Sequence, residues 1–182
     1  MRIVIGLGNP GEKYAKNRHN IAWLALDYWL ENPRWTLNKK FKALTYEQGE
    51  TLFVKPLSFM NESGQVAQKI LSYYKLLPTS LGILRKKDSD LSDCLSVIHD
   101  DLDINFGAWK IATDSSSAGH RGVQSIINHL KTQKFTRLRL GIKNENLRLH
   151  IPADKFVLQN FKGEELSELP SLFSLVKSEI IK

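Results

Sequence analysis

The chain has few residues of the kinds that cross-link a protein or anchor it in a membrane. Among its 182 residues Cys94 is the one cysteine, so no internal disulfide can form, and a reducing compartment fits. The apolar run Arg2–Leu7 is far too short for the core of a signal peptide or for a membrane span. No internal repeat or low-complexity tract occurs, apart from the short run Ser115–Ser117. We therefore expect a single cytoplasmic domain over residues 1–182, without a membrane segment.

The composition is that of a globular protein with a basic surface. Hydrophobic residues make up 42% and charged residues 25% of the chain, which is enough for a packed core. The formal net charge is +7 and the isoelectric point is near 9.5, which favours a polyanionic partner such as nucleic acid. Mild basicity that serves only solubility is the alternative, and charge by itself does not decide between the two.

Hydrophobic periodicity predicts strands alternating with helices. The predicted strands are Arg2–Leu7, Lys42–Glu47, Thr51–Pro56, Cys94–His99, Phe106–Thr113 and Phe135–Ile142, the last with its arginines alternating outward. The predicted helices are Asn20–Glu31, a segment capped by Asn61 with Val66, Ile70, Tyr73 and Leu77 on one face, Arg121–Leu130, Lys155–Leu158 and Glu164–Ile181. We interpret Thr79–Asp93 as an exposed excursion with no packing role and Asp114–Gly119 as a flexible loop. The pattern indicates an α/β sandwich whose hairpin makes the sheet mixed.

The turn after the first strand is rich in glycine. Its sequence, Gly6-Leu-Gly8-Asn-Pro-Gly11, matches the dinucleotide-binding pattern G-x-G-x-x-G. That function needs a helix that starts at the turn and holds the pyrophosphate. Pro10 within the turn and the absence of a helical face over Glu12–Arg18 disfavour such a helix, and Asp27, the candidate acid, lies in the middle of the next one. A nicotinamide or flavin cofactor is therefore the disfavoured alternative.

His19 stands eight residues after Gly11, immediately before a predicted helix. A strand end, a polar loop and a titratable imidazole at one rim are typical of an active site. The plainer interpretation is that His19 only begins the helix, and Asn9 and Asn61 likewise fit ordinary turn and cap positions.

Five blocks in order resemble the bacterial-type peptidyl-tRNA hydrolases. They are Gly6–Gly11 with Tyr14 and Arg18–Asn20, Ser58–Gly64, His99–Asp103, Ser116–Val123 and Phe135–Ile142. Together they extend from Met1 to about Phe161. The resemblance implies a single α/β domain around a twisted mixed sheet flanked by helices, a three-layer sandwich. It also implies an enzyme, cytoplasmic, usually monomeric and free of metal and cofactor, that hydrolyses the ester between a peptide and the 3′-ribose of tRNA and so recycles tRNA from aborted translation.

The resemblance also assigns roles to residues of the site. His19 would be the general base that activates water, oriented by Asp100. Asn9 and Asn61 would contact the water, the peptide backbone and the terminal nucleotide, while Tyr14 and Met60 would shape the pocket wall or simply pack. His120 is a candidate for substrate contact. His99 is predicted to face the opposite side of its strand from Asp100.

Three cations would meet the phosphates of tRNA, namely Lys110, Arg137 and Arg139. Such contacts give salt-sensitive affinity with little base specificity. A solvated basic edge that prevents strand pairing is the alternative. Asp101 and Asp103 lack the spacing of a metal site, so we expect no metal there.

The chain departs from the family pattern at several positions. Arg121 replaces a usual asparagine, Ala112 a frequent basic residue, and the segment 81–93 is longer than usual. Arginine is longer than asparagine and accepts no hydrogen bond. These departures motivate the second hypothesis, a non-catalytic RNA-binding relative of the same fold.

Overall fold

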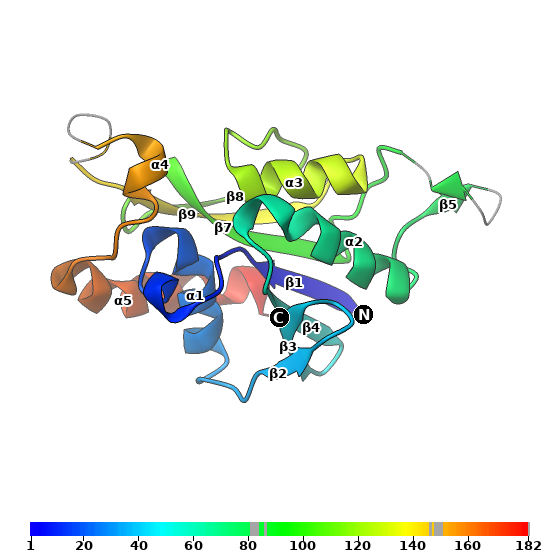
Figure 1. The fold of residues 1–182 in the computed structure, drawn as a ribbon, viewed down its shortest axis with the longest axis horizontal. Coiled ribbons are helices and arrows are strands. Elements are labelled where there is room, and N and C mark those ends of the chain that lie inside the picture. Colours follow the sequence, from blue (N-terminus) through cyan, green and yellow to red (C-terminus); the bar gives the residue numbers. More distant parts are fainter. Residues whose placement is uncertain (81–83, 86, 146, 148–150, 182) are drawn as a thin grey trace.

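The computed structural model contains one mixed seven-stranded sheet, in the order β2-β3-β4-β1-β7-β9-β8 (Figure 1). The structure describes residues 1–80, 84–85, 87–145, 147 and 151–181. The strands are β1 (Arg2–Gly6), β2 (Thr36–Asn38), β3 (Ala43–Gln48), β4 (Thr51–Pro56), β7 (Leu95–Asn105), β8 (Trp109–Ala112) and β9 (Thr136–Lys143). Strands β4, β1, β7 and β9 run parallel, whereas β2, β3 and β8 pair antiparallel at the two edges. The two-stranded β5 (Thr79–Ser80) and β6 (Leu84–Arg85) lie outside this sheet.

Helices cover both faces of the sheet and make three layers. Figure 1 shows α2 and α3 on one side and α1 and α5 on the other. The helices are α1 (Ile21–Trp29), α2 (Ser63–Tyr73), α3 (Arg121–Leu130), α4 (Ala153–Phe156) and α5 (Gly163–Ile180). Two hydrophobic clusters fill the spaces between the layers, one beneath α1 and α5 and the other beneath α2 and α3. The predicted α/β sandwich with a mixed sheet is confirmed.

Strand β1 is central, which explains why its sequence is apolar without alternation. Ile3, Val4 and Ile5 are all fully buried, because one face of the strand meets each cluster. The turn that follows leads into a three-residue 3-10 helix, Glu12–Tyr14, and not into a long helix. A Cβ on Gly8 would lie 2.7 Å from the Trp23 ring, so this glycine allows α1 to pack against the turn. The geometry that holds a dinucleotide pyrophosphate is therefore not formed here.

Several predicted elements need correction. The prediction of no packing role for Thr79–Asp93 is wrong, because Leu91 is buried in the core and its N–H donates to the Lys134 carbonyl; positions 81–83 and 86 lie outside the described residues. Tyr73 is 53% exposed, so the buried face of α2 ends at Leu71. β2 was not predicted, β7 continues to Asn105, and β8 is shorter than expected.

The part of the chain that the structure describes contains no helix that is both long and apolar enough to cross a bilayer.

Candidate active site

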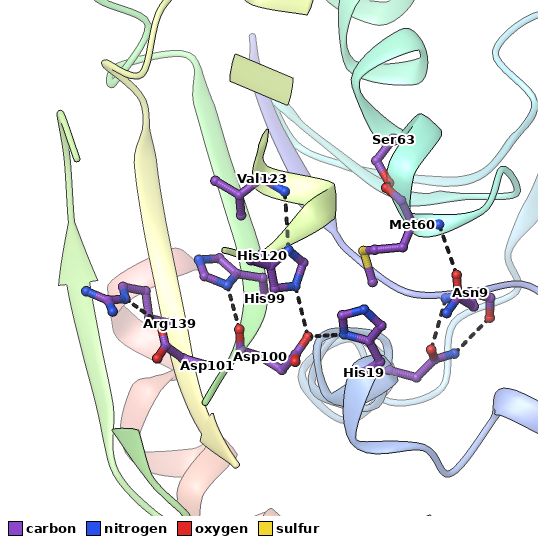
Figure 2. Close-up of polar contacts among 11 residues, drawn as sticks. Asn9, His19, Met60, Ser63, His99, Asp100, Asp101, His120, Val123 and Arg139 are labelled. Carbon is purple, nitrogen blue, oxygen red and sulfur yellow. Dashed lines mark hydrogen bonds and ion pairs between the residues drawn. The ribbon is translucent and has the colours of Figure 1, made fainter. Parts of the chain in front are cut away.

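The side chains of His19 and Asp100 lie close together near the carboxyl end of β1, beside the parallel strand β7. His19 lies in a 3-10 turn, Arg18–Asn20, directly before α1, and Asp100 lies in β7. Nδ1 of His19 is 2.7 Å from Oδ1 of Asp100 (Figure 2). If Nδ1–H donates to the carboxylate, Nε2 of the neutral ring is the unprotonated nitrogen. This is the geometry of a general base held by an acidic partner.

Asp100 is buried but charged. Its side chain is only 2% exposed. Burial alone would raise the pKa of this carboxyl, but His19 and His120 beside it outweigh burial and hold the pKa well below its usual range. The carboxylate therefore remains an anion at neutral pH and can stabilise an imidazolium next to it.

His120 is a second imidazole on the same carboxylate oxygen. It is the N-cap of α3, and its Nδ1 accepts a hydrogen bond from Val123 N at 3.2 Å. Because Nδ1 is the acceptor, the proton of the neutral ring lies on Nε2, which donates to Asp100 Oδ1 at 3.0 Å. Figure 2 shows the two rings next to each other, both reaching the same oxygen of the Asp100 carboxylate. The helix cap thus sets the tautomer of His120, and His120 helps to aim the carboxylate at His19.

The same three side chains also have the composition of a metal site. One ligand atom from each of His19, Asp100 and His120 lies within 4.8 Å of the others. The tautomer argues against coordination, because the Nε2 of His120 that faces Asp100 carries the proton while Nδ1 accepts from Val123. Metal binding would require this cap to break, so the group fits a hydrogen-bonded cluster better than a metal centre.

His99 lies behind this cluster. Strand alternation places it on the α3 side of β7, where its ring centroid is 4.7 Å from that of His120. Nδ1–H donates to the Asp100 carbonyl at 2.7 Å, whereas buried Nε2 has no partner among the described residues. Burial, and then the neighbouring His120, lower the pKa of His99 to about 3, so this ring is neutral at the near-neutral pH at which His19 would act as a base.

Asn9 stands at the other side of His19 and is fixed by three hydrogen bonds. Its N–H donates to Asn20 Oδ1, Asn20 Nδ2 donates to the Asn9 carbonyl, and Met60 N donates to Asn9 Oδ1, each at 2.9 Å. Because Oδ1 is occupied, the free side-chain group of Asn9 is the Nδ2 donor. From the sequence, the Asn9 amide could donate or accept a hydrogen bond. In the structure only its Nδ2 donor remains for a substrate, because Oδ1 already accepts from Met60 N.

Comparison with known proteins identifies the family. The family model described as peptidyl-tRNA hydrolase matches residues 3–181. The chain belongs to the peptidyl-tRNA hydrolase family. The resemblance drawn from the five blocks is thereby confirmed, and with it the expected class of enzyme, a hydrolase.

Relatives and solved structures of this family align over most of the chain. A peptidyl-tRNA hydrolase of Mycoplasma capricolum is 41% identical over 191 aligned positions, which cover 100% of this chain and 91% of the relative. One from Latilactobacillus sakei is 40% identical and covers 79% of this chain and 76% of its own length. The crystal structure of peptidyl-tRNA hydrolase from Acinetobacter baumannii matches with a TM-score of 0.79 at 25% identity, covering 98% of this chain and 86% of that one.

The other predicted pocket residues differ in their exposure to solvent. Met60 is buried in the core beneath α2 and α3, and Tyr14 is half-buried in the 3-10 helix after the glycine turn. The prediction that Asn61 caps the next helix is wrong: a 3-10 turn over Met60–Glu62 intervenes, and Glu62 takes the cap position of α2. Asn61 and Arg121 are exposed, and neither side chain bonds to any other described residue.

Of the three predicted phosphate-binding cations, the structure removes one. Arg137 is 1% exposed, and its guanidinium donates to the Ser115 and Ser116 carbonyls, so the prediction that it points outward is wrong. The loop over 114–119 is consequently anchored to β9. Lys110 is exposed and is the register partner of Arg139, whose Nε donates to Asp101 Oδ2 at 2.7 Å.

Sequence reasoning missed two contributors, Asn20 and Arg18. Both belong to the quoted block Arg18–Asn20, but no separate role was assigned to them. Asn20 fixes the Asn9 backbone, and Arg18 is buried against the C-terminal part of the chain. The local signal was available, since an asparagine and an arginine flank the candidate histidine, but their partners lie elsewhere in the sequence.

Proposed function

We propose that this chain hydrolyses the ester between a peptide, or an N-blocked aminoacyl group, and the 3′-ribose of tRNA, with His19 as the general base. The observation that carries the proposal is the 2.7 Å contact of His19 Nδ1 with the buried Asp100 carboxylate. Because Nδ1 faces Asp100, the basic Nε2 points away from the carboxylate. Histidine is the side chain that most often acts as a general base in enzymes.

The reaction needs only groups of this chain and water. Nε2 of His19 takes a proton from water, and the hydroxide attacks the carbonyl carbon to give a tetrahedral oxyanion. The C–O bond to the ribose then breaks, and Nε2–H returns the proton to the leaving 3′-oxygen. Asp100 stabilises the transient imidazolium, and the free Nδ2 of Asn9 is the donor for the oxyanion. A donor of this kind contributes roughly 3 kcal/mol to the transition state.

Polar, charged and apolar groups around the cluster suit the tRNA and peptide parts of the substrate. Lys110 and Arg139 lie on paired strands and would contact phosphate oxygens. Asn61 and Arg121 would reach the terminal nucleotide or the peptide, and Tyr14, Met60 and the ring of His120 would line the wall. We place the protein in the cytoplasm, where peptidyl-tRNA arises, and expect a monomer with no metal or cofactor; light scattering measures the oligomeric state.

The test is the release of free tRNA from an N-blocked aminoacyl-tRNA, with a chelator present throughout. We expect turnover by the wild type and loss of about 10²–10⁴ in rate for His19→Ala. His129→Gln, which changes another histidine on the far part of α3, is the matched control and should stay within about twofold of the wild type. Full activity of His19→Ala would exclude His19 as the base, while salt-dependent RNA binding without any turnover would favour the non-catalytic relative.

A further inference from the structure

The segment that carries His19 is hydrogen-bonded to residues 157–161, which come much later in the sequence. Residues 16–19 pair with residues 157–161, beside α4 and before α5, through backbone hydrogen bonds. These run from Phe161 N to the Lys16 carbonyl (3.0 Å), from Arg18 N to the Gln159 carbonyl (3.0 Å) and from His19 N to the Val157 carbonyl (2.9 Å). The backbone of His19 is therefore held by this C-terminal segment, while its ring is held by β7.

Arg18 holds this junction together. Its side chain is 2% exposed, and its guanidinium carbon lies 4.6 Å from the Phe156 ring centroid and 5.3 Å from that of Phe161. One terminal nitrogen donates to the Asn160 carbonyl at 2.7 Å, and the other donates to both carboxylate oxygens of Glu165, at 2.8 and 2.6 Å. A planar guanidinium that stacks and bonds in this way is not replaceable by lysine without loss.

Glu165 connects the junction to two further elements. Its carboxylate accepts from the N–H of Lys162, the N-cap residue of α5, at 2.7 Å and from Asn144 Nδ2, just after β9, at 2.9 Å. Burial alone would raise the pKa of Glu165, but these hydrogen bonds and Arg18 outweigh it and lower the pKa, so the group is an anion at neutral pH. The Arg18–Glu165 ion pair thus fixes residues 16–19 to α5 and to the sheet together.

We propose that Arg18 is a positioning residue for catalysis: through its bonds to Asn160 and Glu165 it sets the place of the His19 backbone, and hence the contact of Nδ1 with Asp100. The inference rests on the proposed function, because the histidine it places is the proposed base. Asp100 belongs to β7, which is paired with a strand on each side, so a shift of residues 16–19 relative to the sheet would lengthen the Nδ1–Oδ1 distance. A displacement of about 1 Å in such a site can cost about 10²-fold in rate.

A purely structural role makes a different prediction. An arginine that only stabilises the fold would lower the melting temperature when replaced, but the folded fraction would keep its turnover number. The chain offers a matched control in Arg2, whose guanidinium donates to the Ile180 carbonyl at the end of α5 (3.0 Å) and to Ser96 Oγ (3.2 Å) without touching residues 16–19. Arg2→Met therefore loosens the same helix at a point away from His19.

The experiment compares Arg18→Met, Arg18→Lys, Glu165→Gln and Arg2→Met with the wild type, well below each melting temperature. We measure kcat and KM for release of tRNA. We also record the low-field proton NMR signal of the His19 Nδ1–H, which reports its hydrogen bond to the Asp100 carboxylate. Positioning predicts a fall in kcat of about tenfold to 10²-fold for Arg18→Met with KM within about threefold, loss or displacement of the NMR signal, partial recovery in Arg18→Lys, and wild-type kcat in Arg2→Met.

The proposal is overturned if folded Arg18→Met keeps the wild-type kcat and NMR signal, or if Arg2→Met lowers kcat as much. Should Arg18→Met fail to fold, Arg18→Lys and Glu165→Gln decide by the same two readouts, since each retains most of the side-chain volume. If the wild type hydrolyses nothing, the proposed function fails on its own account, while the NMR signal still shows whether Arg18 positions His19.

Discussion

The cluster around Asp100 and the cationic pair of Lys110 and Arg139 lie on neighbouring strands but are built in opposite ways. In the cluster, a buried carboxylate accepts from two imidazoles whose positions are set by a helix cap and a backbone junction. In the pair, Lys110 is exposed and Arg139 uses only its Nε on Asp101. Burial gives the first region fixed geometry suited to bond making, whereas the exposed Lys110 and the partly exposed Arg139 stay in contact with water and can meet phosphates at more than one position. The first should govern kcat and the second KM.

The largest effect should come from removing the negative charge at the centre of the cluster. Asp100→Asn presents an amide in place of the carboxylate, so the imidazolium of His19 loses its counter-ion and the ring is free to adopt the wrong tautomer. We expect kcat to fall by roughly 10²–10⁴-fold, as for the equivalent change in hydrolytic triads. Steady-state kinetics with N-blocked aminoacyl-tRNA measures it. A main effect on KM would show that Asp100 serves binding instead.

Loss of the second imidazole should have a smaller effect on the same constant. His120→Asn keeps a side chain that can cap α3 but shortens the reach to Asp100, so one hydrogen bond to the carboxylate is lost. A hydrogen bond to a charged group is worth about 1.5–3 kcal/mol, which corresponds to a fall in kcat of roughly tenfold to 10²-fold. An effect as large as that of Asp100→Asn would mean that His120 itself acts in the proton transfer.

The cationic pair should respond in the other constant. The double variant Lys110→Ala with Arg139→Gln is expected to raise KM several-fold, to leave kcat nearly unchanged, and to reduce the slope of log affinity against log salt by about one for each lost phosphate contact. Ala112→Ser, on the same strand as Lys110, is a matched neutral control. An unchanged salt slope would assign the pair to a solvated edge with no role in tRNA binding.

The smallest effect at neutral pH should come from His99, which contributes to stability instead of turnover. Its pKa is lowered in the folded protein, so between the ordinary histidine value near ~6.5 and the folded value the unfolded chain binds the extra proton. Stability should therefore fall as the pH drops below ~6.5, by at most about 1.4 kcal/mol per pH unit from this group. Urea unfolding at a series of pH values measures the slope, and His99→Gln should flatten it; an unchanged slope would assign the pH dependence to other groups.

Features that depend on the local sequence pattern were predictable. Features that depend on which distant segment packs over a side chain were not. The apolar run of β1 predicted a strand, and the resemblance of the ordered blocks paired His19 with Asp100. Arg137 and Arg139 are two residues apart on one face of β9, and nothing local shows that the loop over 114–119 covers the first and not the second. The inserted turn over Met60–Glu62 likewise moved the helix cap from Asn61 to Glu62.

The attachment of residues 16–19 to residues 157–161 sets an order of events during synthesis of this protein. When a ribosome has added residue 150, His19 and Asp100 are already part of the nascent chain, but residues 157–161, which bond to the backbone of residues 16–19, are not. A chain that stopped short of residues 157–161 would therefore hold both His19 and Asp100 but would lack the backbone partners of residues 16–19.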